Sequence, residues 1–144
     1  MTATARVPEA GGARMRALHD RALELRREAV ELGDRDVDAY ARVLDASGPD
    51  EARSALSRAA DPPLEIAALA AELSELAAEA ARSGSHRLRG DALTGALLAE
   101  VAARAASELV GIDLADHPRD PRHARARVAA ARASAAGESA VSGA

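Results

Sequence analysis

Asp36 is the residue of this sequence with the clearest potential for chemistry, because it falls on the apolar side of a predicted helix. From Arg14 onward, small and apolar residues recur every three or four positions, which is typical of a packed helix. A carboxylate on such a side is costly unless it is paired or functional, and a buried one can transfer protons near neutral pH. The alternative is that Gly33 ends the helix and Asp36 caps or solvates the next one. The apolar positions are Met15, Leu18, Ala22, Leu25, Ala29, Leu32, Ala39, Val43 and Ala46.

Two further candidates for proton transfer lie close together in the sequence. Asp91 follows Gly90 at the start of a predicted helix, and His86 lies in the loop SGSHRLRG that precedes this helix. A histidine in such a loop can shuttle protons near neutral pH. The alternatives are an ordinary helix cap for Asp91 and a solvated surface position for His86.

The segment from His117 to Arg132 is basic, since it contains five arginines and only Asp120 as an acidic residue. Such a segment could bind a polyanionic ligand through side chains such as Arg122 and Arg125. It could equally pair with acidic side chains of neighbouring helices. Nucleic acid is not an expected partner, because no aromatic residues are interleaved with the arginines and the whole chain has a net charge of −4.

The composition predicts an all-α fold. Alanine occupies 40 and leucine 16 of the 144 positions, whereas Phe, Trp and Cys are absent and Tyr40 is the only aromatic residue. This mixture favours helices over a sheet core, and without cysteine there is no disulfide, thiolate nucleophile or cysteine-ligated metal. The sequence also has no HExxH or ExxH pair, no glycine-rich phosphate loop, no membrane span and no secretory signal. We therefore expect a cytoplasmic protein without a bound metal.

We expect one helical domain of about five helices over residues 14–135, preceded by a flexible arm (1–13) and followed by a disordered tail (136–144). The predicted helices span 14–46, 49–60, 63–82, 91–114 and 121–135, with a break or kink at Pro62–Pro63. Small residues around most of the fourth helix suggest contacts on more than one side, and hence a homodimer. Its predicted apolar stripe comprises Leu93, Leu97, Val101, Ala105, Leu109 and Ile112. A row on the third helix, which we interpret as a solvated face, comprises Glu65, Glu72 and Glu79.

Four blocks of the sequence, taken in order, resemble the formimidoyltetrahydrofolate cyclodeaminase / methenyltetrahydrofolate cyclohydrolase family. ELGDRDVDAYARVLDA is similar to a family helix with an acidic residue shortly before Ala-Tyr, and ALSRAADPPLEIAALAAEL to an alanine-rich helix entered through prolines. SGSHRLRGDALTGALLAEVAARAA resembles a loop whose aspartate leads into an alanine-rich helix. SELVGIDLADHPRDPRHARARV resembles the closing segment and final helix. The resemblance covers residues 14–132.

The resemblance implies a helical bundle and one-carbon folate chemistry. The reactions would close a formimino group into methenyltetrahydrofolate with loss of ammonia, or open the methenyl ring with water. In this interpretation Asp36, Asp91 and His86 handle protons, Tyr40 contacts the pterin, and Arg122 and Arg125 bind a polyglutamate tail. Tyr40 could instead pack in the core. A tetrahydrofolate derivative would be the substrate, and no separate cofactor would be needed. The protein would be a homodimer and would not bind a membrane.

The sequence also departs from the family pattern. It lacks the glycine-rich turn and helix with which the family begins, and the lysine that follows the Ala-Tyr helix. Where the family has asparagines, it has Ser85, Leu109 and Asp113. We therefore expect a shortened domain with reduced activity. The alternative is a non-catalytic helical protein, in effect a pseudoenzyme, that acts through an oligomeric surface.

Overall fold

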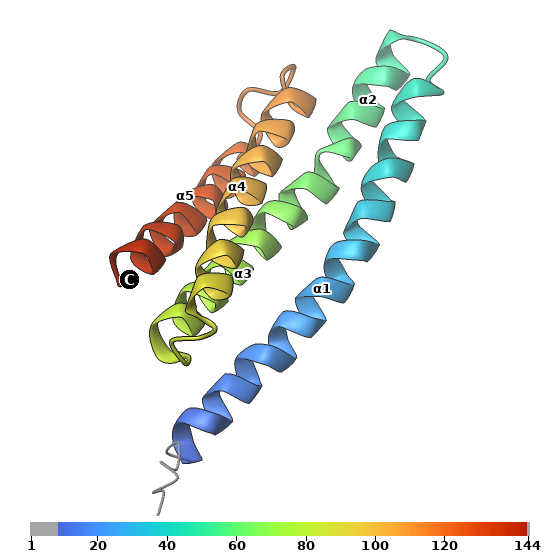
Figure 1. Ribbon diagram of the computed structural model, residues 1–144. Helices are drawn as coiled ribbons and strands as arrows, with labels where there is room; N and C mark the ends of the chain where they lie inside the picture. The colour runs from blue at the N-terminus through green and yellow to red at the C-terminus, as the bar shows by residue number, and fades with distance from the viewer. Residues whose placement is uncertain (1–8, 144) are drawn as a thin grey trace, which may run out of the picture.

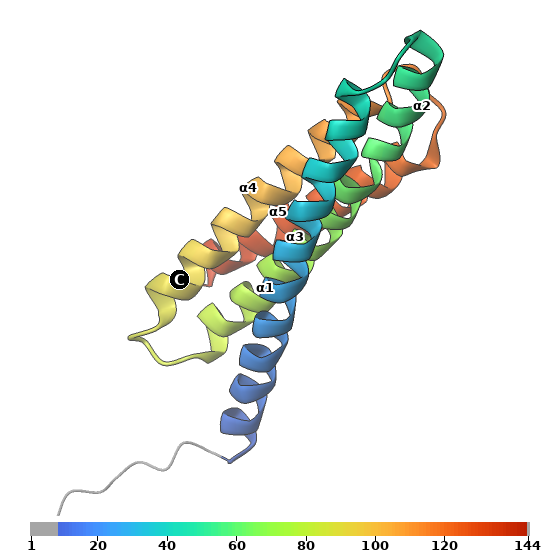
Figure 2. The same cartoon turned by 90° about the vertical axis from the view of Figure 1, so that its right-hand side faces the viewer.

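The computed structural model describes residues 9–143, and this part of the chain is all-α, as predicted. α3, α4 and α5 pack against one another, and α1 lies along another side of α3 (Figures 1 and 2). None of the helices in this range carries an apolar stretch long enough to cross a membrane. Residues 1–8 of the predicted arm and residue 144 lie outside the described residues. The helices are α1 (Glu9–Leu44), α2 (Pro49–Ala59), α3 (Asp61–Ser83), α4 (Arg89–Asp113) and α5 (Pro121–Ser142).

α1 is one continuous helix that passes through Gly33, as predicted. A side chain at Gly33 would meet open space, so no close contact requires glycine at this position. The helix begins at Glu9, so the prediction of a flexible arm is wrong for residues 9–13. Because α1 is continuous, Asp36 lies one turn beyond the buried Leu32, on the side that faces the bundle.

α2 and α3 are separated only by Ala60, so they form nearly one rod and the bundle consists of four rods. The amide of Ala60 donates a hydrogen bond to the carbonyl of Leu56, and the amide of Leu64 donates to the carbonyl of Ala60. Pro62 and Pro63 occupy the first turn of α3, where a missing N–H group breaks no helical hydrogen bond. The predicted break is therefore confirmed at Ala60, and the proline pair lies in the first turn of the helix that follows it.

The disordered tail predicted from residue 136 is wrong up to Ser142, because α5 continues to that residue. Ala136 and Ala140 are buried and pack with Ala96 of α4. Helices gain most of their stability from packing of one face, so these contacts order the last two turns. Little in the sequence indicated burial in this segment, because the side chains that are buried there are small.

Alanine side chains form the core between α3, α4 and α5. One methyl group at each contact allows the helix backbones to come close together. The hydroxyl of the buried Ser74 lies 3.0 Å from the carbonyl oxygen of Ala96 and 3.2 Å from that of Ala133, so it links α3 to both neighbours. The largest core cluster contains Ala67, Ala70, Ala71, Ala103, Ala106, Ala129 and Ala133.

The apolar stripe predicted for the fourth helix is wrong as a packing face. Val101, Leu109 and Ile112 are exposed, and Leu98 beside them is exposed as well. Bulky side chains at every contact would keep the helices apart, so α4 packs mainly through alanines and turns most of its large residues outward. The buried positions of α4 are Ala96, Ala99, Ala103, Ala106 and Val110.

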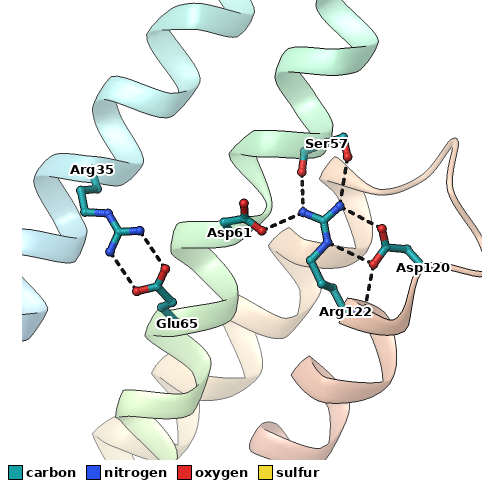
Figure 3. Close-up of polar contacts among 6 residues, drawn as sticks. All are labelled: Arg35, Ser57, Asp61, Glu65, Asp120 and Arg122. Atoms are coloured by element: carbon teal, nitrogen blue, oxygen red, sulfur yellow. Dashed lines mark hydrogen bonds and ion pairs between the residues drawn. The ribbon is translucent and has the colours of Figure 1, made fainter.

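α1 is attached to α3 by buried leucines that recur every seven residues and by a row of ion pairs beside them. In each pair the arginine donates two hydrogen bonds to a glutamate carboxylate, with distances of 2.5–3.0 Å. The guanidinium group lowers the pKa of each glutamate, mainly through these hydrogen bonds. The glutamate row, which we interpreted as a solvated face, is thus partly exposed, but it is also the face that binds α1. The pairs are Arg14–Glu79, Arg21–Glu72 and Arg35–Glu65, the last of which is drawn in Figure 3.

The spacing set by the alanine core can be tested at Ala103, which is fully buried. Ala103→Leu adds carbon atoms where no space exists, so we expect the free energy of unfolding to fall by about 1–3 kcal/mol. Ala102→Leu makes the same change at an exposed position of the same helix, and it should alter this free energy by less than about 0.5 kcal/mol. Urea unfolding followed by circular dichroism measures both. Equal effects of the two variants would contradict an alanine-determined spacing.

Candidate functional site

A pocket of about 250 Å³ lies between α1, the junction of α2 and α3, and the last turn of α4. We call it the carboxylate pocket, because two aspartates from different helices line it and no basic residue does. Its walls are otherwise apolar apart from a tyrosine. The lining residues are Asp36, Tyr40, Ala59, Pro63, Leu109, Ile112 and Asp113.

The helices bring these residues together for identifiable reasons. Asp36 and Tyr40 are four residues apart on α1, so they lie on the same side of the helix. Leu109, Ile112 and Asp113 are likewise three and four residues apart at the end of α4. Arg35, next to Asp36, binds Glu65 of α3, with its Nη1 and Nη2 atoms 2.8 and 2.7 Å from the carboxylate oxygens (Figure 3). This ion pair sets the position of α1 along α3 at the level of the pocket.

The two carboxyl groups of the pocket influence each other. Burial raises the pKa of Asp113, and the negative charge of Asp36 raises it further. No basic side chain lines the pocket to offset these two charges. The pocket therefore holds two candidate groups for proton transfer, one of which has a raised pKa.

Tyr40 lies at the edge of the carboxylate pocket and is 52% exposed. The alternative that it packs in the core is therefore wrong. Its ring and hydroxyl group are accessible to a ligand that enters the pocket.

Asp91 lies at the other end of the groove between α1 and α4. It lines a second pocket of about 310 Å³ together with His19 and apolar residues of α1 and α3. The 17 positions between His19 and Asp36 correspond to about 25 Å along α1. Asp91 is the third residue of α4 and Leu88 is the N-cap, so Asp91 is not the capping residue, although its carboxylate lies in the first turn, where a negative charge stabilises a helix.

His86 is exposed in the connection between α3 and α4. It belongs to the same end of the molecule as Asp91, because it precedes the first turn of α4 by three residues. The structure therefore brings together Asp36 and Tyr40 but leaves Asp91 and His86 apart from them.

Arg122 is held by groups of the chain itself, as Figure 3 shows. Its Nη1 donates to the carbonyl of Ser57 at 2.6 Å and to Asp61 at 2.8 Å, and its Nη2 donates to the Ser57 hydroxyl at 3.0 Å. Its Nε and Nη2 also donate to the carboxylate of Asp120, at 3.0 and 2.9 Å. The guanidinium keeps the pKa of Asp120 far below its usual value. Arg122 thus connects the start of α5 to the α2–α3 junction.

Two other arginines of the basic segment, Arg125 and Arg132, differ in their contacts. Arg132 pairs with Glu75 of α3 at 2.8 Å, which fits the expected pairing with acidic side chains. Arg125 is exposed on α5 and forms no ion pair within the described residues. A polyanion site at Arg122 and Arg125 would therefore have only Arg125 with an uncommitted side chain.

Asp113 is the site residue that sequence reasoning missed as a candidate for chemistry. The sequence contained one indication, because Asp113 stands where the resembled family has an asparagine of its closing segment. Its distance of 77 positions from Asp36 hid the pairing of the two carboxyl groups. No group of three or more metal-binding side chains gathers within the described residues.

Comparison with known families gives one match. The family model described as Formiminotransferase-cyclodeaminase matches residues 1–133 of the 144-residue chain. No curated protein and no solved structure matches the chain significantly.

The raised pKa of Asp113 predicts how stability depends on pH. A carboxyl group whose pKa is higher in the folded state than its ordinary value of 3.8 destabilises the fold once pH rises above that folded value. Asp113→Asn should therefore increase the free energy of unfolding at pH 7 and change it little at pH 3. Urea unfolding at both pH values measures this. Asp38→Asn, an exposed position on α1, should have no effect at either pH; a gain at pH 3 equal to that at pH 7 would contradict the prediction.

The hydrogen bonds of Arg122 predict a structural role. Arg122→Ala leaves the Ser57 carbonyl and two carboxylates without their donor, so we expect the free energy of unfolding to fall by about 1–3 kcal/mol. Arg125→Ala is the matched control and should change it by less than about 0.5 kcal/mol. Thermal or urea unfolding distinguishes the two. Similar small effects would mean that Arg122 contributes little to the junction.

Proposed function

Because the chain belongs to the formiminotransferase-cyclodeaminase family, we propose that its carboxylate pocket binds the reacting part of a tetrahydrofolate derivative and carries out a cyclodeaminase or cyclohydrolase reaction. The observation that carries this proposal is the pair Asp36 and Asp113 in one pocket, with the pKa of Asp113 raised. The missing lysine and asparagines of the family pattern support turnover that is lower than in members that have them.

The cyclodeaminase reaction needs an acid and a base at the same place. One folate nitrogen attacks the formimino carbon and loses its proton, while the formimino nitrogen must gain two protons before it leaves as ammonia. In our proposal Asp36 acts as the base, which takes the proton of the attacking nitrogen and passes it to the leaving nitrogen. Asp113 donates the second proton from its protonated form, which its raised pKa makes more populated than in an ordinary aspartate. Carboxyl groups transfer protons efficiently when their pKa is close to the working pH.

The same pair suits the charge of the product. Closing the ring forms a cationic methenyl group, and carboxylates in a pocket without basic residues stabilise a cation. In the hydrolytic direction, one ionised carboxylate would remove a proton from the water that attacks this group. Tyr40 at the edge of the pocket supplies a ring that can stack on a pterin.

A second candidate function is a non-catalytic interaction protein. The observation in its favour is the set of large apolar side chains that α1 and α4 leave exposed. This observation is also compatible with an enzyme that acts as a homodimer, and we propose a homodimer as the active unit.

Substitution of the two aspartates tests the proposed reaction. Asp36→Asn and Asp113→Asn keep the side-chain size but remove proton transfer, so each should lower turnover by about 100- to 10,000-fold. Formation of the methenyl product, followed by its absorbance, and release of ammonia measure the rate with formiminotetrahydrofolate. Asp38→Asn is the control, since this exposed residue on α1 does not line the pocket.

Binding should be measured on the same variants. A tetrahydrofolate titration that shows binding without turnover in the unmodified chain would support a retired enzyme, and no binding would support the interaction protein. Asp91→Asn and His86→Ala should keep the rate, because both residues lie away from the carboxylate pocket. A loss in Asp91→Asn equal to that in Asp36→Asn would contradict our choice of pocket.

A further inference from the structure

The outer surface of α4 carries an apolar stripe that no other segment of residues 9–143 covers. Leu98, Val101 and Ile112 are 67%, 61% and 66% exposed, and Leu109 is 46% exposed. The exposed Ala105 lies between them. Isolated exposed apolar residues are ordinary, but five on one side of a single helix form a contiguous surface of the kind that marks an interface.

The spacing of this stripe is symmetric. From Leu98 to Ile112 the steps are three, four, four and three residues, with Ala105 at the centre. If a second α4 is placed antiparallel with Ala105 opposite itself, Leu98 meets Ile112 and Val101 meets Leu109. The small residue stands where two helices would cross most closely, and the large residues stand at both ends. A two-fold interface requires this kind of self-complementary pattern.

We propose that this face binds a second copy of the chain, with the two α4 helices antiparallel and Ala105 at the two-fold axis. Charges beside the stripe agree with this arrangement. Arg104 and Glu108 lie on the same edge of the stripe, and the antiparallel arrangement places Arg104 of one copy near Glu108 of the other, twice. Within its own chain, the ion pair of Arg104 is with Glu100, at 4.0 Å. This contact is long, Arg104 is exposed, and Glu108 forms no ion pair within the described residues, so both side chains are available to select the antiparallel partner.

The second copy also changes the carboxylate pocket, and this part of the inference rests on the proposed function. Leu109 and Ile112 form one wall of the pocket and are among the exposed residues of the stripe. In the proposed arrangement, Val101 and Leu98 of the other copy cover them. The partner therefore closes the outer side of the pocket and shields the two carboxyl groups from water, which strengthens their interactions with a bound ligand.

Cysteine substitution tests the arrangement directly, because the chain has no cysteine of its own. Ala105→Cys should form a covalent dimer on mild oxidation with diamide, since two-fold symmetry places the two thiols together. Leu98→Cys and Ile112→Cys should cross-link when mixed and not when oxidised separately. Ala131→Cys, exposed on α5, is the control and should stay monomeric on a non-reducing gel. Cross-linking of Leu98→Cys or Ile112→Cys with itself would overturn the antiparallel arrangement.

The charges and the pocket have separate tests. Arg104→Glu or Glu108→Arg alone should weaken dimerisation by about 3- to 10-fold in sedimentation, and the two changes together should restore it. A sedimentation result that shows only monomer for the unmodified chain would overturn the dimer.

Val101→Glu does not alter a lining residue of the pocket, and we expect it to abolish dimerisation while circular dichroism remains unchanged. The turnover of this variant should fall by at least 10-fold, and full turnover in the monomer would overturn the covering of the pocket. Cross-linking and sedimentation do not depend on folate. A dimer without folate turnover would therefore contradict the proposed function and leave this interface intact.

Discussion

The close packing of α3, α4 and α5 on alanine is the constraint on which the rest of this structure depends. A core of methyl groups lets the three backbones approach, but it leaves little space for larger side chains. Most of the large apolar residues of α4, among them Leu98, Val101, Leu109 and Ile112, therefore turn outward. The result is an unusual distribution for a protein of this size, with a small-residue core and large apolar residues on its surface.

The position of α1 is decided by a different interaction. α1 contacts α2 and α3 but does not pack on α4, so a groove remains between α1 and α4 above α3. Leucines at every seventh position supply the apolar contact, and bidentate arginine–glutamate pairs beside them define how far α1 is shifted along α3. Such partly exposed pairs contribute little stability individually, but a register error would place like charges or apolar groups opposite them.

The position of α1 along α3 determines which side chains meet in this groove. With Arg35 bound to Glu65, the next residue, Asp36, reaches the level of the last turn of α4, where Asp113 lines the same pocket. Placing two acidic groups in one pocket opposes folding at neutral pH. The helices that carry these two groups are held in place by the arginine–glutamate pairs and by the nearby hydrogen bonds of Arg122. Functional sites commonly combine such a local cost with rigid surroundings.

The sequence by itself determined the all-α class, the continuity of α1 through Gly33, the side of α1 on which Asp36 lies and the resemblance to the family. These features follow from composition and from a three-to-four-residue repeat, which are local properties of the chain. The tertiary structure alone decided which side of α4 is buried, because alanine favours a helix equally on every side and large residues normally point inward. It also decided that Glu65, Glu72 and Glu79 bind arginines of α1, that α5 continues to Ser142 and that Asp113 joins Asp36. Each of these depends on contacts between helices far apart in the chain, where the energy of packing and ion pairing outweighs any local preference.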